Sequence, residues 1–127
     1  MSTMICIHQA DLSSHNNDSK FHPRIGSLSA DQLEAVCELW SEPDAEVGTW
    51  ECTVGKFPSV KNGRHEISFV LSGRAEIKCD SNGQTVTVVA GDLLILPDGW
   101  SGQWDVRETL RKIYVNIPVS HVASLIT

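Results

Sequence analysis

The sequence predicts an all-β fold, a single antiparallel barrel or sandwich that is preceded by a short helix. Two observations carry this prediction. From Val47 onward, runs rich in strand-forming residues follow one another, with turn signals about every 8 to 12 residues. In addition, Asp80-Ser81-Asn82-Gly83 is a strong hairpin signal, because Asn-Gly accepts the positive φ angles that tight hairpin turns require. A chain of 127 residues suits one domain with a core of its own.

The residues before the barrel are expected to form an arm and a short helix. Residues 11–26 are polar and rich in turn-forming residues. Ser29 and Gln32 have the spacing of a helix capping box. Apolar residues then follow at helical spacing, and these are Leu33, Val36, Cys37 and Trp40. The pattern predicts a short amphipathic helix over residues 30–40, and Pro43 and Asp44 are expected to prevent its continuation.

Residues 1–45 are therefore expected to be this arm and helix, packed on the barrel, and residues 46–127 the barrel itself. Its first strand is predicted from the alternation of Trp50, Cys52 and Val54 with polar residues. A turn is expected around residues 58–63, where Pro58 and Gly63 stand. The later strands are predicted at residues 65–71, 74–79, 84–89, 92–96, 100–106 and 109–117.

Composition excludes several classes of partner and location. The formal net charge is −6, and the ten Lys and Arg residues form no basic run, which disfavours nucleic acid as a partner. No apolar segment approaches the roughly 20 residues needed to cross a bilayer, and the N-terminus does not read as a signal peptide. The four cysteines form no C-x-x-C pair and are expected to be reduced thiols of a cytoplasmic protein.

Two spaced motifs lie on the predicted strands. Glu66 stands seven positions before Gly73, and a second motif follows with Gly91, Pro97 and Gly99. In both motifs the chain resembles the cupin superfamily, whose members fold as a double-stranded β-helix, or jelly-roll barrel. The resemblance implies this architecture for the present chain.

Within the cupins, the stretches Gly48–Gly55 and Arg111–Tyr114 are similar to one small group. This group includes the ureidoglycine aminohydrolase domains and the cupin of ethanolamine utilisation. Many of its single-domain members have no assigned function, so the resemblance implies the fold more firmly than an activity.

The cupin resemblance also implies metal-ligand positions, and three of the four carry no ligand here. The two family histidines before the glutamate fall in the window from Ser59 to Asn62, and the later histidine corresponds to Gly102. Glu66 alone is a poor site for a first-row metal, so we expect no metal and no other cofactor. The alternative is a metal-dependent enzyme with an atypical set of Glu66, His65 and waters, although neighbours on a strand point to opposite faces.

The resemblance implies that Glu66 faces the barrel interior, where a small-molecule pocket is expected. A glycine at the family's histidine position, Gly102, makes the wall recede between two indoles on the same strand face. Such a mostly apolar cleft with a few polar groups is the usual form of a ligand site. The expected ligand-binding residues are Lys61, Asn62, Ser68, Trp100, Gly102 and Trp104.

Glu66, Lys112 and Tyr114 are the expected catalytic residues. A carboxylate inside a barrel is costly to bury unless it is paired or protonated. Glu66 is therefore either an acid, base or charge anchor for a ligand, or the structural partner of a lysine, with Lys112 favoured and Lys61 second. The inward face of the last strand stays open, because an equally apolar stripe is formed by Ile113, Val115 and Ile117.

Three functions follow from these residues. The first is a cupin that binds or transforms a small polar metabolite, the second a non-catalytic sensor or binding subunit with the same pocket, and the third the atypical metal enzyme. A homodimer is expected as well, because an apolar outer face needs a cover, and the candidates are the N-terminal helix and a second subunit. The outward residues of that strand are His65, Ile67, Phe69 and Leu71.

Overall fold

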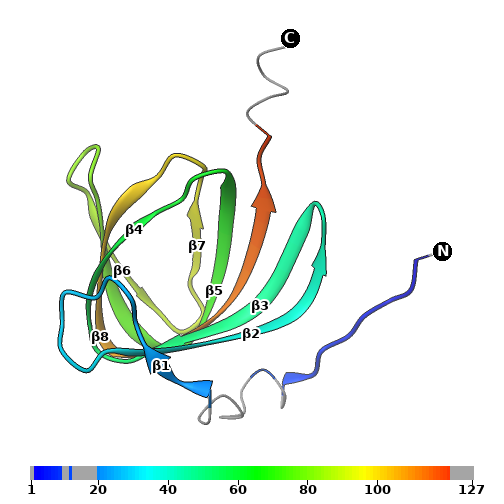
Figure 1. Cartoon of the computed structure of the whole chain (residues 1–127), viewed down its shortest axis with the longest axis horizontal. Helices are drawn as coiled ribbons and strands as arrows, with labels where there is room; N and C mark the ends of the chain where they lie inside the picture. The colour runs from blue at the N-terminus through cyan, green and yellow to red at the C-terminus, as the bar shows by residue number, and fades with distance from the viewer. Residues whose placement is uncertain (1, 10–11, 13–19, 121–127) are drawn as a thin grey trace.

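The structure is a computed structural model, and it describes residues 2–9, 12 and 20–120 of the chain. Eight antiparallel strands curl into a barrel that is open at one end (Figure 1). The all-β jelly-roll prediction is confirmed. The strands are β1 (His22–Pro23), β2 (Leu33–Glu42), β3 (Ala45–Cys52), β4 (Gly55–Val60), β5 (Arg64–Cys79), β6 (Thr85–Val89), β7 (Leu93–Leu96) and β8 (Ser101–Pro118).

Two long strands, β5 and β8, pair with each other along most of their length and belong to both halves of the barrel. The first half of β5 pairs with β7, and its second half pairs with β6. Likewise β8 pairs with β4 through its first half and with β3 through its second half. Strands β2 and β1 extend the sheet beyond β3. The two halves of the barrel are therefore held together by continuous strands.

The bend of β5 lies at Gly73, where two separate strands were predicted. The register between β5 and β8 shifts between Val70 and Ser72 and again before Arg74. Gly73 has φ of 90°, and a side chain there would collide with the carbonyl oxygen of Thr109. Glycine satisfies both requirements, so one strand continues through the bend.

The predicted helix over residues 30–40 is wrong, because residues 33–42 form strand β2. This strand pairs with β3, and its register shifts between Glu38 and Trp40. Leu33, Val36 and Cys37 all precede this shift, and apolar residues on both faces of the strand produce the spacing that resembles a helix. Sheet pairing with β3 outweighs the weak helical propensity. The boundary drawn at residue 45 therefore lies within a β-hairpin.

Ser29 and Gln32, which were predicted to cap a helix, form hydrogen bonds between the entry loop and the barrel instead. The Gln32 side chain is buried and donates a 3.0 Å hydrogen bond to the carbonyl oxygen of Thr53. Its Oε1 atom accepts a hydrogen bond from the Ser27 hydroxyl at 2.5 Å. The Ser29 hydroxyl accepts a bond from the backbone N–H of Lys56 at 2.9 Å. Both residues thus fasten the entry loop to the barrel.

Strand β4 was partly assigned to a turn because of Pro58. Proline lacks a backbone N–H and is tolerated in a strand only where no ladder bond is needed from it. Among the described residues, β4 pairs with β8 alone, with Pro58 opposite Gln103. Pro58 therefore fits an edge strand.

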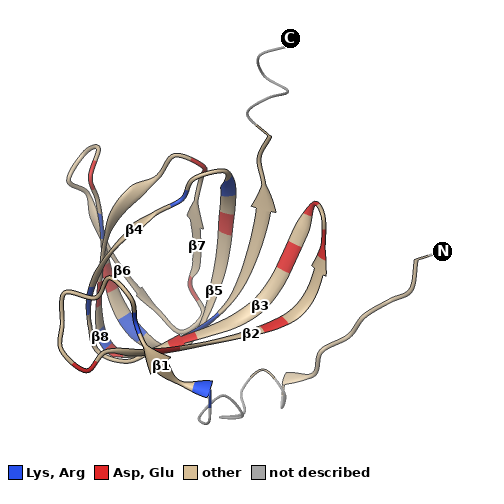
Figure 2. Ribbon diagram, viewed as in Figure 1, with Lys and Arg blue, Asp and Glu red and all other residues tan. Residues whose placement is uncertain are grey.

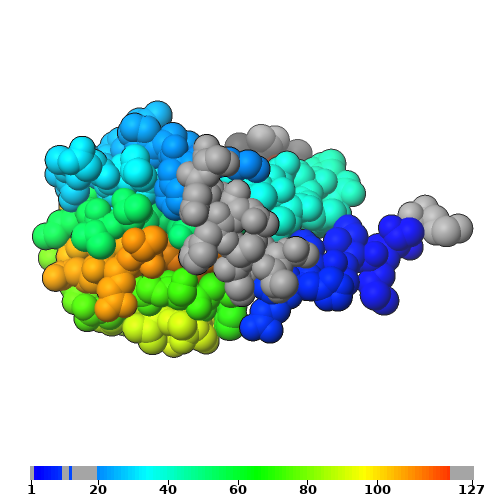
Figure 3. Space-filling view, turned by 90° about the horizontal axis from the view of Figure 1, so that it is seen from below, coloured from blue at the N-terminus to red at the C-terminus, as the bar shows by residue number. Residues whose placement is uncertain are grey.

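The hydrophobic core fills the closed part of the barrel. It contains Cys52, Phe57, Val70, Ala75, Ile77, Val88, Leu96, Trp104, Val106 and Leu110. An ion pair away from the core joins Arg111 to Glu51 at 3.1 Å, and both side chains are buried. Arg111 Nε also donates a 2.7 Å hydrogen bond to the Leu12 carbonyl oxygen. Residues 2–9 then extend away from the barrel (Figures 1 and 3).

Acidic residues are concentrated on β2 and β3 (Figure 2). The two strands contain Glu34, Glu38, Glu42, Glu46 and Glu51 but no Lys or Arg. Across the described ranges, no helix is long and apolar enough to cross a membrane.

Candidate functional site

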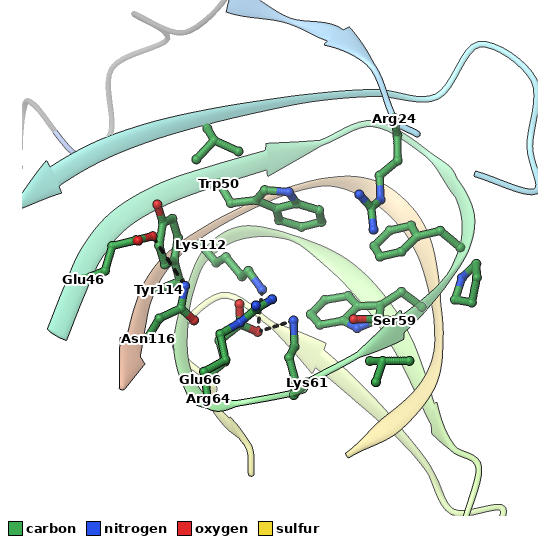
Figure 4. A pocket seen from close by; sticks show the side chains of 15 residues that line it. Arg24, Glu46, Trp50, Ser59, Lys61, Arg64, Glu66, Lys112, Tyr114 and Asn116 are labelled. Carbon is green, nitrogen blue, oxygen red and sulfur yellow. Dashed lines mark hydrogen bonds and ion pairs between the residues drawn. The ribbon is translucent and has the colours of Figure 1, made fainter. Parts of the chain in front are cut away.

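A cavity of about 360 Å³ occupies the open end of the barrel. Residues of β2, β3, β4, β5 and β8 line it, together with Arg24, which follows β1, and Lys61, which follows β4 (Figure 4). Four cationic side chains reach it, and these are Arg24, Lys61, Arg64 and Lys112. Two carboxylates, those of Glu46 and Glu66, face them.

The centre of the site is a buried cluster of two lysines and one glutamate. Lys61 Nζ and Lys112 Nζ each lie 3.3 Å from the same oxygen of Glu66, Oε2 (Figure 4). All three residues are buried, with 4 to 7% of their surface exposed. The cluster carries a net charge of +1 when all groups are ionised. Because this excess charge is removed from water, the site favours a further anion or the loss of one lysine proton.

Strand geometry positions each member of this cluster. Glu66 on β5 lies between Leu96 of β7 and Asn116 of β8. Lys112 on β8 lies opposite Trp50 of β3. Lys61 follows β4 directly, and its backbone is fixed by two hydrogen bonds: its N–H to the Trp100 carbonyl at 2.8 Å, and its carbonyl from the Gly99 N–H at 2.7 Å.

Electrostatics shift the pKa of all three groups. Burial lowers the pKa of Lys112 from 10.5 to about 8, although Glu66 opposes this shift. Burial also lowers the pKa of Lys61. For Glu66, burial acts to raise the pKa, but the two ammonium groups outweigh it and hold the pKa below 4.5. Glu66 is therefore ionised near neutral pH, which suits a charge anchor rather than a proton donor.

Three aromatic rings adjoin the charged cluster: Phe57 and Trp104 belong to the hydrophobic core, and Trp50 packs against it. Phe57 and Trp104 stack at 5.9 Å with an interplanar angle of 9°. Trp50 meets Trp104 edge to face at 5.9 Å. Lys112 Nζ lies 4.8 Å from the Trp50 ring centroid and 4.5 Å from that of Trp104, so both indoles face its positive charge.

The cavity also contains buried polar atoms that lack a hydrogen-bond partner among the described residues. They are Nε of Arg24, Nε of Arg64, Nε1 of Trp104 and Oδ1 of Asn116. Three are donors and one is an acceptor. Because buried polar groups are normally satisfied, this set indicates a guest or solvent molecules rich in acceptor atoms.

The face of β8 that points into the barrel carries Lys112 and Tyr114 rather than the stripe of Ile113, Val115 and Ile117. Both residues are buried and line the cavity, whereas Ile117 is 37% exposed on the outer face. The Tyr114 hydroxyl lies so close to Gly48 that a side chain there would collide with it. Burial and the neighbouring Glu46 carboxylate raise the pKa of Tyr114, so its hydroxyl stays protonated.

Four of the expected ligand-binding residues lie elsewhere than in this cavity. The Trp100 ring covers Gly102, where a side chain would collide with it, so the indole fills the space that was expected to be a cleft. Trp100 Nε1–H points to Cys79 Sγ at 3.1 Å. Ser68 is buried below the site. Asn62 lines an adjoining hollow of about 460 Å³.

Comparison with known proteins places the chain in a family. The family model described as the EutQ-like cupin domain matches residues 43–114, more than half of the chain. The chain belongs to the EutQ-like cupins. The solved EutQ protein of Clostridium difficile is similar to this cupin, with 25% identity, a TM-score of 0.64 and coverage of 76% of this chain and 71% of that one.

Two further solved structures show the same fold. An ethanolamine utilization protein Q from Salmonella typhimurium LT2 is 23% identical, with a TM-score of 0.64 and coverage of 79% of this chain and 80% of that one. The Schizosaccharomyces pombe Cnp3 cupin domain is 16% identical, with a TM-score of 0.62 and coverage of 72% and 69%. The search of the curated proteins finds no match to this EutQ-like cupin.

The metal that the cupin fold implies does not fit this donor set. The inward carboxylate of Glu66 is contacted by two ammonium groups, which repel a cation and supply no lone pair while protonated. His65 points away from Glu66, and its Nδ1 accepts a 2.9 Å bond from the Asp98 backbone N–H. No group of three or more His, Cys, Asp or Glu residues that could hold a metal occurs in the described ranges. The atypical Glu66–His65 set is therefore not assembled.

Several cavity residues were missed at the level of sequence. They are Arg24, Val36, Glu46, Trp50, Phe57, Pro58, Ser59, Val60, Arg64 and Asn116. Alternation along the last strand identifies Asn116, which is two residues beyond Tyr114. Trp50 was recognised as a strand residue, but its facing was not assigned. Arg24 lies outside the predicted barrel, and no local pattern brings it to the site.

Proposed function

We propose that this EutQ-like cupin binds a small anionic metabolite, with a carboxylate group, in the cavity at the open end of the barrel. The observation that carries the proposal is the shared carboxylate of Glu66, which neutralises only one of two buried lysines. An incoming carboxylate supplies the second negative charge. The charge-assisted hydrogen bonds that it accepts are among the stronger ones in proteins.

The surrounding residues support the same ligand class. The Nε atom of Arg64 and Nε1 of Trp104 are buried donors that have no hydrogen-bond acceptor among the described residues. The rings of Trp50, Phe57 and Trp104 offer an apolar wall to the remainder of a small ligand. Glu66 acts in this proposal as a charge anchor that keeps the two lysines in place, and the Tyr114 hydroxyl as a neutral polar partner.

A thermal-shift and calorimetric series tests the proposal. Malonate and oxalate are expected to raise the melting temperature and to give a saturable heat signal in the calorimeter. Propane-1,3-diamine, a dication of similar size, is expected to give neither effect. Lys61→Gln, which removes one positive charge, is expected to weaken malonate binding by roughly tenfold, the loss of a charge-assisted hydrogen bond. Lys78→Gln, an exposed lysine on β5, is the matched control. Equal binding of the diamine, or unchanged affinity in Lys61→Gln, contradicts the proposal.

Binding without turnover is the second candidate function. It is favoured by the ionised state of Glu66, because its lowered pKa makes this carboxylate a poor general acid near neutral pH. A sensor or binding subunit needs the cavity but no proton donor. Incubation with saturating ligand distinguishes the two, since a catalyst converts it and a binding protein returns it unchanged.

We further propose that the protein forms a homodimer through the outer face of β5 and β7. Three exposed apolar side chains gather there: Phe69 at 43%, Leu93 at 63% and Ile95 at 56% exposure. Phe69 is paired with Leu93 across the strands, so the patch is continuous. Residues 2–9 extend from the barrel with exposed Met4, and they provide an arm that a second copy can receive.

Sedimentation of the wild type and Leu93→Glu tests the dimer. A dimer mass at micromolar concentration, reduced to a monomer mass in the variant, is the expected result, because a charge is costly to bury in an apolar interface. A wild-type monomer counts against the dimer. The proposed cytoplasmic location is supported by the four unpaired cysteines, of which Cys6 is exposed.

A further inference from the structure

We infer that the Lys112 amine forms an imine with the carbonyl group of a small oxo acid bound in the cavity. The inference rests on the proposed anion site and names the substrate class as aldehydes and ketones that carry a carboxylate. Lys112 is the more buried of the two lysines, with 4% of its surface exposed against 7% for Lys61, and its Nζ lies close to the carboxylate of Glu66 and to two indole rings. Lys112 Nζ is thus a nucleophile in addition to a partner of the Glu66 carboxylate.

The charge of the cluster makes a free amine available. Glu66 offers one negative charge to Lys61 and Lys112, both 3.3 Å from the same oxygen. With two positive charges and one negative charge buried together, the neutral form of a lysine is more accessible than it is for an exposed lysine. The groups that face Lys112 are Glu66, Lys61 and the Cys52 thiol, whose pKa burial raises to about 12. Cys52 is therefore uncharged, and it does not hold the proton on Lys112.

Burial supports Lys112 as the neutral member. The pKa of Lys112 falls from 10.5 to about 8, so the fraction of free amine near neutral pH is roughly three hundredfold larger than for an exposed lysine. Lys61 also has a pKa that is lowered by burial and by the neighbouring Arg64, but it is less buried than Lys112, with 7% of its surface exposed against 4%. It stays available as a cation for the carboxylate of the substrate.

The reaction balances with these groups and a proton from solvent. The lone pair of Lys112 Nζ adds to the carbonyl carbon, and the carbonyl oxygen takes up the proton that the nitrogen releases. The resulting hydroxyl group leaves as water after a second protonation, and a carbon–nitrogen double bond remains. No group is oxidised or reduced. The second proton comes from solvent at the open end of the cavity, so the Lys61 ammonium, with Glu66 as its counterion at 3.3 Å, keeps its charge.

The residues around Lys112 also stabilise the imine product. A protonated imine keeps the positive charge on nitrogen, where Trp50 and Trp104 face it at 4.8 and 4.5 Å and Glu66 balances it. The substrate carboxylate then lies toward the donors of Lys61 and Arg64. An aldehyde without a carboxylate lacks this second anchor and is expected to react more weakly.

Reductive trapping tests the inference. The full chain is incubated with glyoxylate and cyanoborohydride, and the reduced adduct is counted by intact mass and located by peptide mass spectrometry. One saturable adduct per chain at Lys112 is expected. Malonate in excess is expected to suppress it, and acetaldehyde at the same concentration is expected to label Lys112 at least roughly tenfold less.

Variants separate Lys112 from ordinary surface lysines. Lys112→Arg keeps the charge but offers no nucleophile, so the saturable adduct is expected to fall by at least roughly tenfold. Lys78→Arg on the exposed surface is the control and retains it. Peptide mapping of the wild type keeps the test decisive if Lys112→Arg does not fold.

Each outcome decides between the proposals. Label that is spread over exposed lysines, or that resides on Lys61, overturns the imine. Malonate binding without any trapped adduct also overturns the imine and leaves the anion site intact. Absence of both binding and adduct overturns the two proposals together.

Discussion

Replacing Glu66 with glutamine removes the only carboxylate that contacts Lys61 and Lys112 among the described residues. Two buried ammonium groups then face each other without a counterion. Breaking a buried ion pair by removing one partner costs about 3 to 5 kcal/mol in free energy of unfolding. We expect Glu66→Gln to lose about this amount near neutral pH. The loss is expected to shrink as the pH rises toward 10.5, because deprotonated lysines need no counterion.

Urea unfolding, followed by tryptophan fluorescence at neutral and at alkaline pH, measures this difference. Glu76→Gln is the matched control, since Glu76 lies on the same strand and pairs with Arg107 at 3.3 Å on the exposed surface. Exposed pairs contribute about 0 to 1 kcal/mol, so this control is expected to be nearly neutral. A loss in Glu66→Gln no larger than in the control, or one that does not depend on pH, refutes the buried-cluster argument.

Three further predictions concern the same structure. Wild-type unfolding free energy should fall as the pH drops below 4.5, because the unfolded chain then binds a proton on Glu66 that the folded protein does not yet bind. It should rise from about pH 8 toward 10.5, where the unfolded chain still binds the proton that folded Lys112 has released. Lys112→Met, measured by urea midpoints, should remove the second effect. Gly102→Ala should lose about 1 to 3 kcal/mol in chemical denaturation, because the added methyl group meets backbone and ring atoms, and an unchanged midpoint contradicts the close packing. Cys6 should react with a thiol reagent in the native state and Cys52 only after unfolding, because Cys52 is buried with a raised pKa; rapid loss of both thiols would contradict this.

The barrel strands are largely predictable from sequence, because half-buried strands and Asn-Gly turns leave local signatures. The Asp80–Gly83 turn is present as expected, with Gly83 at φ of 70°. Strand β2 was mistaken for a helix because it carries apolar residues on both faces, Val36 on one and Leu33 and Cys37 on the other. Pro58 concealed an edge strand, since the cost of proline depends on which neighbour pairs with it.

The candidate site is less predictable, because its members come together only through the fold. The alternation of Glu66 on β5 and of Lys112 and Tyr114 on β8 correctly groups those residues by face. The same alternation placed Trp100 beside Trp104, but Trp100 lies at a turn and folds over Gly102. Arg24 arrives from outside the predicted barrel, and its place depends on tertiary packing that no sequence period encodes.

The most direct test of the central claim is a crystal structure of the protein with malonate. The charge excess around Glu66 predicts a carboxylate of malonate within hydrogen-bond distance of Lys61 Nζ, with further oxygens near the guanidinium of Arg64. A well-ordered crystal at high malonate concentration that shows only solvent in this cavity would contradict the account, as would malonate bound solely on the outer surface.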